Sequence, residues 1–121
     1  MEPTPPAGLE LTGRAEEVIP LAVHMGQGAR MTSLLIEIIG WFAAALILAS
    51  YVLLSLGRLE PRGVVYQGMN VVGAAGFVLN SGYNGALPSA GLNVIWAAMG
   101  LFTLWSVWRA RRAADGSSQQ G

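Results

Sequence analysis

Residues 63–108 read GVVYQGMNVVGAAGFVLNSGYNGALPSAGLNVIWAAMGLFTLWSVW, and none of these 46 residues is Asp, Glu, Lys or Arg. A helix rising about 1.5 Å per residue crosses a hydrocarbon core of about 30 Å with about 20 residues. The stretch is therefore long enough for two crossings and too long for one. The sequence NSGYNG over 80–85, followed by Pro88, supplies the turn between them. We predict helices over 64–82 and 87–108.

A third apolar segment precedes this stretch. Residues 34–56 read LLIEIIGWFAAALILASYVLLSL, with Glu37 as the only charged residue, and a short charged hairpin follows over 57–63. A chain of 121 residues is too small to bury, in water, three helices that are apolar on nearly every face. We therefore predict an all-α integral membrane protein, with a three-helix bundle over 34–108 and short hairpin loops.

The composition excludes several classes of protein. Only 12% of the residues are charged, against about 25% in soluble domains, and the mean hydropathy is +0.48. The absence of Cys excludes disulfide scaffolds, iron–sulfur clusters and thiolate zinc sites. The net charge is zero and the arginines are dispersed, so there is no basic footprint for nucleic acid. His24 and Glu37 have no chemical partners at catalytic spacing, so we expect no enzyme, metal or cofactor.

The two ends of the chain differ from the apolar middle. Residues 1–33 contain scattered Pro, Glu and Gly, and we expect them to be disordered, or to lie upstream of a true start at Met31. Residues 109–121 form a basic and then polar tail. Three crossings place the 57–63 loop and the C-terminus on one side of the membrane. The side with the 57–63 loop and the C-terminus carries five arginines: Arg58, Arg62, Arg109, Arg111 and Arg112. By the positive-inside rule that side is cytoplasmic, and the N-terminus lies outside.

Tryptophans accompany the arginines at the cytoplasmic end of the last helix. Trp105 and Trp108 fit an inner aromatic belt, and Arg109, Arg111 and Arg112 fit contacts with anionic lipid headgroups. We predict that these five residues anchor the protein to membrane lipid.

Polar and small residues recur at helical spacing in all three segments. The first helix offers such a face at Glu37, Trp41, Ala44, Leu48 and Ser55. The candidate residues for a polar pocket or a packing face inside the bundle are Glu37, Gln67, Asn70, Asn80, Asn93 and Trp96. Interhelical hydrogen bonds are common between membrane helices, which favours the packing interpretation over a cavity for a small polar solute or a proton. The helix over 64–82 is the most polar of the three, so its amides are expected to face protein rather than lipid.

A combined motif over residues 35–108 resembles a family of small uncharacterised bacterial membrane proteins, described as hypothetical or permease-like under a CBU-type locus name. The motif consists of Gly40-Trp41, Ser50-Tyr51, Tyr66-Gln67-x-x-Asn70-x-x-Gly73, Asn80, Gly85-Ala86-x-Pro88-Ser89 and Leu92-Asn93-x-x-Trp96. The resemblance implies three helices in the inner membrane and brings no established activity. A looser likeness to SemiSWEET and PQ-loop half-transporters rests on Asn93 and Trp96, but their Pro-Gln pair is missing from the first helix.

Two functions remain open from the sequence. The first is a non-enzymatic inner-membrane protein that self-associates or serves as an accessory subunit of a larger membrane complex. The alternative is a homodimeric small-solute transporter of the half-transporter type, with its path near Glu37, Asn70, Asn93 and Trp96.

Overall fold

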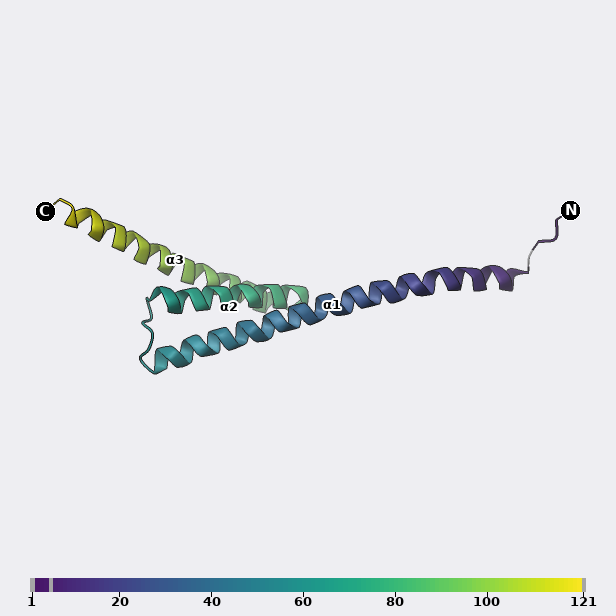
Figure 1. Cartoon of the computed structure of the whole chain (residues 1–121), viewed down its shortest axis with the longest axis horizontal. Helices are drawn as coiled ribbons and strands as arrows, with labels where there is room; N and C mark the ends of the chain where they lie inside the picture. The colour runs from purple at the N-terminus through teal and green to yellow at the C-terminus, as the bar shows by residue number, and fades with distance from the viewer. Residues whose placement is uncertain (1, 5, 121) are drawn as a thin grey trace. The chain divides into compact units, whose positions relative to one another are not determined.

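The protein consists of three helices joined by two short turns. The structure, a computed structural model, describes residues 2–4 and 6–120, and within these residues it contains no strand. The helices are α1 (Ala7–Ser55), α2 (Val64–Tyr83) and α3 (Leu87–Ser118) (Figure 1). The predicted all-α fold with three helices is confirmed. The chain divides into two compact units, residues 1–35 and residues 36–121, which are described in turn.

The first unit is helical from Ala7 onward, so the expectation of a disordered segment over 1–33 is wrong for the residues that the structure describes. Residues 1 and 5 lie outside the described residues. The segment from Ala7 contains many good helix formers, with Leu, Ala, Glu, Met and Arg between its glycines, and α1 continues through Pro20. Every side chain described from Pro6 to Leu35 is exposed. This part of α1 is therefore held by local backbone geometry and not by packing.

In the second unit, α1 and α2 are each followed by a glycine with a positive φ. After α1, Gly57 has a φ of 70°, and the backbone N–H of Arg58 donates to Leu53 O at 2.8 Å. After α2, Gly85 has a φ of 73°, and the N–H of Ala86 donates to Ser81 O at 2.8 Å. Left-handed backbone with this six-to-one hydrogen bond is the Schellman helix end, which glycine adopts without steric cost. These two glycine helix ends account for the predicted hairpin over 57–63 and for the predicted turn between the helices over 64–82 and 87–108.

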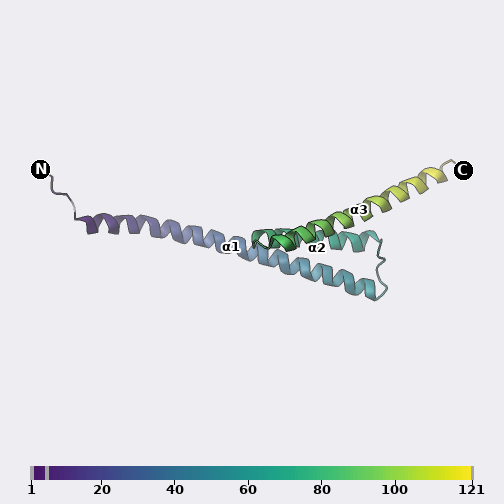
Figure 2. The same ribbon diagram turned by 180° about the vertical axis from the view of Figure 1, so that it is seen from behind.

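Helix α2 packs closely on both neighbours in the second unit. It returns along α1 from the first hairpin, and α3 turns back along α2 (Figures 1 and 2). On the α1 side, a Cβ added at Gly73 would lie 2.5 Å from Ile47 Cγ1, and one at Gly76 would lie 2.8 Å from Ala43 Cβ. On the α3 side, a Cβ at Gly100 would lie 2.6 Å from Val71 Cγ2. Small residues thus allow the close approach that is typical of membrane helices.

The bounds of α2 lie within one residue of the predicted helix over 64–82, whereas α3 is longer than expected. We expected the helix to end at residue 108 and a basic and then polar tail to follow over 109–121, but α3 extends to Ser118. The extension has a physical reason in RARRAA over 109–114, which consists of strong helix formers with no Gly or Pro. Residue 121 lies outside the described residues.

Two segments within these helices are long and apolar enough to cross a membrane: Glu10–Ser55 within α1 and Leu87–Ser118, the whole of α3. Helix α2 does not meet the same criterion within the described residues, since it carries the amides Gln67, Asn70 and Asn80. Two of its polar side chains, Asn70 and Ser81, are buried, and Gln67 and Asn80 are partly buried.

Candidate polar site between the helices

The centre of the polar site is a buried hydrogen-bond network that joins α2 to α1. Asn70 Nδ2 donates to Ser50 Oγ at 3.1 Å and to its own helix at Tyr66 O, at 2.8 Å. Ser50 Oγ in turn donates to Ile47 O at 2.7 Å. Ser50 is 1% exposed and Asn70 is 6% exposed. Because both side chains are shielded from solvent, losing either partner would leave the other with an unsatisfied polar group.

A second polar contact joins the other ends of the same helix pair. Asn80 Nδ2 donates to the backbone oxygen of Ile36 at 2.9 Å. The side chain fits there because Gly40 has no Cβ, and a Cβ at that position would lie 2.5 Å from Asn80 Nδ2. Asn80 thus joins α2 to α1 by an interhelical hydrogen bond, the kind of contact on which the packing interpretation rests.

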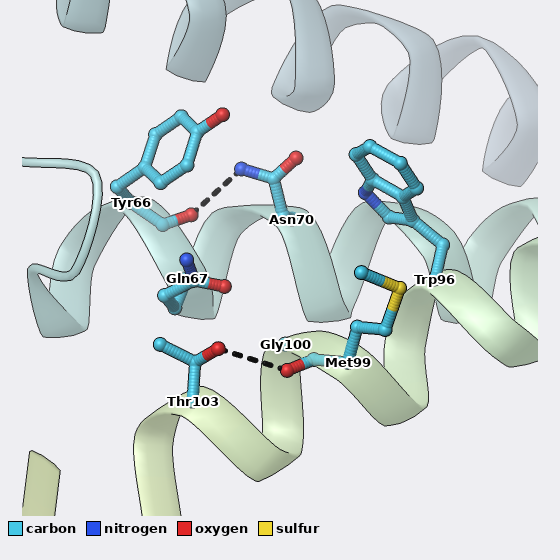
Figure 3. A pocket seen from close by; sticks show the side chains of 7 residues that line it. All are labelled: Tyr66, Gln67, Asn70, Trp96, Met99, Gly100 and Thr103. Atoms are coloured by element: carbon cyan, nitrogen blue, oxygen red, sulfur yellow. Dashed lines mark hydrogen bonds between the residues drawn. The ribbon is translucent and has the colours of Figure 1, made fainter. Parts of the chain in front are cut away.

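Three adjoining pockets surround Trp96 in the second unit, and together we call them the Trp96 groove. The first, of about 180 Å³, is lined by residues of α2 and α3 and is drawn in Figure 3. The second, of about 400 Å³, shares Tyr66, Asn70 and Trp96 with the first and includes Ser50 of α1. The third, of about 320 Å³, shares Trp96 with the second and adds Asn93 and Ser89. None of the residues that line these three pockets is charged.

Two predicted residues lie at the edge of the groove. Gln67 lines the first pocket, but its amide nitrogen donates to Pro61 O at 2.7 Å, at the turn before α2. Asn93 lines the third pocket, and its amide nitrogen donates within α3 to Ser89 O at 2.9 Å. Four of the six predicted residues therefore line the groove: Gln67, Asn70, Asn93 and Trp96.

Glu37 does not join them. It is exposed on α1 and lines none of the three pockets of the Trp96 groove. The face of α1 that meets α2 is instead marked by its buried residues, Gly40, Ala43 and Ser50. The predicted face was displaced by one residue, since Trp41 is 73% and Leu48 is 63% exposed. One residue is about 100° around a helix, which is enough to turn a side chain from the neighbour to the surroundings.

Ser50 is the principal residue of the site that sequence reasoning missed. A signal for it was present, because Gly40, Ala43, Ile47 and Ser50 follow one another at steps of three and four residues. This series contains the two smallest residue types, which are the ones that allow a neighbouring backbone to approach.

Four of the five predicted lipid-anchoring residues form two local pairs on α3. The guanidinium of Arg109 lies 4.9 Å from the ring centre of Trp105, and that of Arg112 lies 4.2 Å from the ring centre of Trp108. Each pair is separated by four residues, so both partners lie on the same helix face. All five residues predicted to anchor the protein are exposed.

Comparison with protein families gives one match. A family model covers residues 36–112, which is more than half of the chain. The chain belongs to this family. The match supports the assignment to the uncharacterised family with CBU-type locus names. No curated protein and no solved structure matches the chain, so nothing supports the looser likeness to half-transporters.

The family region lies within the second unit of the structure, residues 36–121. It begins at Ile36, where that unit begins, and ends at Arg112, after the second tryptophan–arginine pair. The family region thus includes the buried network, the whole Trp96 groove and the residues predicted to anchor the protein, and it leaves out the first unit and residues 113–121.

Proposed function

We propose that this chain is a multi-pass protein of the bacterial inner membrane with three crossings, its N-terminus outside and its C-terminus in the cytoplasm. Two apolar helices of sufficient length support the proposal, as does the burial of polar residues of α2 such as Asn70. The hairpin arginines and those after residue 108 favour this orientation by the positive-inside rule.

We further propose that the protein is non-enzymatic and acts by associating with other membrane helices, either in a homo-oligomer or as an accessory subunit. The observation that carries this proposal is an open face of α2. Gly68, Ala75 and Gly82 lie seven residues apart on it, and a Cβ at Gly68 or Gly82 would meet nothing within 4 Å. The closely packed glycines Gly40, Gly73, Gly76 and Gly100 are already used inside the protomer, whereas this face of α2 is open to a further helix.

Cross-linking in native membranes tests the association. The chain has no cysteine, so an Ala75→Cys variant carries a single thiol. Oxidation is expected to give a disulfide-linked dimer if two copies meet at this face. The matched control is Ile38→Cys, at an exposed apolar position on α1, which is expected to stay monomeric.

Native mass spectrometry from mild detergent separates the two kinds of assembly. A homo-oligomer gives multiples of the chain mass, whereas an accessory subunit copurifies with chains of other masses. A monomer alone, together with the absence of any Ala75→Cys cross-link, would refute the proposed association.

The Trp96 groove favours a second candidate, a homodimeric transporter of small solutes. Asn70, Asn93 and Trp96 line its pockets, and these are three of the residues expected near a solute path. Solute flux into proteoliposomes is expected to fall in Asn70→Ala and Asn93→Ala variants. Unchanged flux in both would remove the groove as the path.

A further inference from the structure

The Trp96 groove contains hydrogen-bonding atoms that the protein itself does not pair. Both hydrogens of the Asn70 amide are used, by Ser50 and by Tyr66, but among the described residues Asn70 Oδ1 accepts no hydrogen bond. The residue is more than nine-tenths buried, yet it leaves no fully buried atom unpaired, so Oδ1 is open to the pockets that it lines. Trp96 is half-exposed, and its indole N–H donates no hydrogen bond among the described residues.

The Asn70 amide oxygen and the Trp96 indole N–H belong to residues that line the same two pockets. In Figure 3 the amide oxygen of Asn70 points away from Tyr66, and the indole nitrogen of Trp96 lies on the side of its ring that faces Asn70. One is an acceptor and the other is a donor. A single hydroxyl group placed between them would satisfy both, since it donates one hydrogen and accepts another.

The depth of Asn70 and Trp96 in the proposed membrane raises the cost of leaving their polar groups unpaired. Trp96 lies in the middle of the predicted crossing over 87–108, and Asn70 lies within one turn of the middle of α2. Water is scarce at that depth, so an unpaired polar group costs more there than at the membrane surface. An occupant that completes both hydrogen bonds is therefore favoured.

The walls of the groove define the class of occupant. They include the aromatic rings of Tyr66, Phe77 and Trp96 with aliphatic side chains such as Ile47, and no charged residue. Such walls accept a flat, uncharged ring and oppose an ion. The largest of the three pockets, of about 400 Å³, falls in the range of small-molecule sites.

We propose that the Trp96 groove binds an uncharged, lipid-soluble ring that carries a hydroxyl group, a molecule of the phenol or hydroquinone class. The hydroxyl donates to Asn70 Oδ1 and accepts from Trp96 Nε1, and the ring lies among the aromatic walls. The inference rests on the membrane location proposed above. If the groove is a transport path, it also narrows the solute to uncharged aromatic molecules.

Solution NMR of the full chain in lipid nanodiscs tests the site with 2-naphthol as the probe. Naphthalene, which has the same rings without the hydroxyl, is the control ligand. The four tryptophans give four indole N–H signals, of which Trp41, Trp105 and Trp108 serve as internal references. Saturable shifts of the Trp96 indole and Asn70 amide signals are expected with 2-naphthol and not with naphthalene.

Substitutions with matched controls distinguish a loss of hydrogen bonding to the ligand from a general disturbance of the fold. Trp96→Phe retains an aromatic ring and removes the donor, so binding of 2-naphthol above that of empty nanodiscs is expected to weaken about tenfold. Trp105→Phe makes the same change at an equally exposed tryptophan that lines none of the three pockets, and it is expected to leave binding unchanged. Asn70→Leu removes the acceptor and is expected to weaken binding similarly, with Asn84→Leu in the turn as its control.

Three results would overturn the inference. An unsaturable response or none means that the groove is not a site for this class, and equal responses to both ligands mean that it holds apolar chains. A Trp96 shift that follows protein concentration without ligand means that a second copy fills the groove. Extraction of the membranes with alkaline carbonate beforehand tests the membrane location separately, because a protein released by carbonate would refute the location and not the site.

Discussion

Asn70 Nδ2 donates a hydrogen bond of 3.1 Å to Ser50 Oγ, and this contact joins α2 to α1. A Ser50→Ala substitution leaves one buried amide hydrogen of Asn70 without its acceptor. Because polar contacts between membrane helices contribute about 1 kcal/mol each, we expect unfolding to become easier by about that amount. Unfolding in mixed micelles of detergent and denaturing surfactant measures the change.

A double-mutant cycle isolates this contact. Ser50→Ala, Asn70→Leu and the double variant are expected to be non-additive, with a coupling of about 0.5–1.5 kcal/mol. Additive losses would mean that the two side chains contribute independently, and the hydrogen bond would then have no measurable role in joining α1 to α2.

Close packing at Gly73 gives a second prediction. A methyl group at this position meets Ile47 Cγ1 and lies 3.3 Å from the backbone oxygen of Ala43, so Gly73→Ala is expected to destabilise the protein by about 1–3 kcal/mol. Gly68→Ala in the same helix has open space and is expected to be neutral or slightly stabilising. Restoration of stability in Gly73→Ala by Ile47→Ala would identify the clash directly. Equal effects of the two glycine substitutions would contradict it.

The end of α2 gives a third prediction. Gly85 has a φ of 73°, a conformation that costs an L-amino acid about 1–2 kcal/mol, so Gly85→Ala is expected to lower stability by about 1 kcal/mol. Gly82 is helical and open, and Gly82→Ala serves as the control. Thermal unfolding in detergent, followed by circular dichroism, compares the two. A loss confined to Gly82→Ala would be inconsistent with the turn described for residues 82–86.

The arginine–tryptophan pairs of α3 give a fourth prediction. Arg109→Gln and Arg112→Gln are each expected to weaken retention of anionic lipid by about 1 kcal/mol, since a basic residue near the surface of an anionic membrane contributes about that amount. Native mass spectrometry with phosphatidylglycerol counts the retained lipids. Arg14→Gln, in the first unit, is the control, and a similar loss there would show that the attraction is unspecific.

Patterns within single segments predicted most of this fold. The absence of charge over 63–108, the NSGYNG turn and Pro88 placed α2 and the start of α3 within a residue. These features act locally, through backbone conformation and the solvation of each helix. Asn70 was also predicted to face protein, because a polar amide in a marginal membrane helix needs a shield.

Features that depend on contacts between helices were harder to predict. The predicted face of α1 was displaced by one residue. The prediction was based on the polar and aromatic side chains of Glu37 and Trp41, whereas the contact with α2 depends on the small size of Gly40 and Ala43. The partner of Asn70 therefore escaped prediction. The lengths of α1 and α3 were underestimated, because membrane thickness limits an apolar crossing and does not limit a helix that continues beyond it.

Accessibility of single cysteines in spheroplasts tests most directly whether the chain is folded back on itself twice within the membrane. The natural chain has no cysteine, so Glu60→Cys, Asn84→Cys and Gly116→Cys each report one position. Asn84→Cys is expected to react with an impermeant maleimide in intact spheroplasts, and Glu60→Cys and Gly116→Cys only after permeabilisation. Labelling of Glu60→Cys and Asn84→Cys from the same side would mean that α2 does not cross, and the three-crossing arrangement would be wrong.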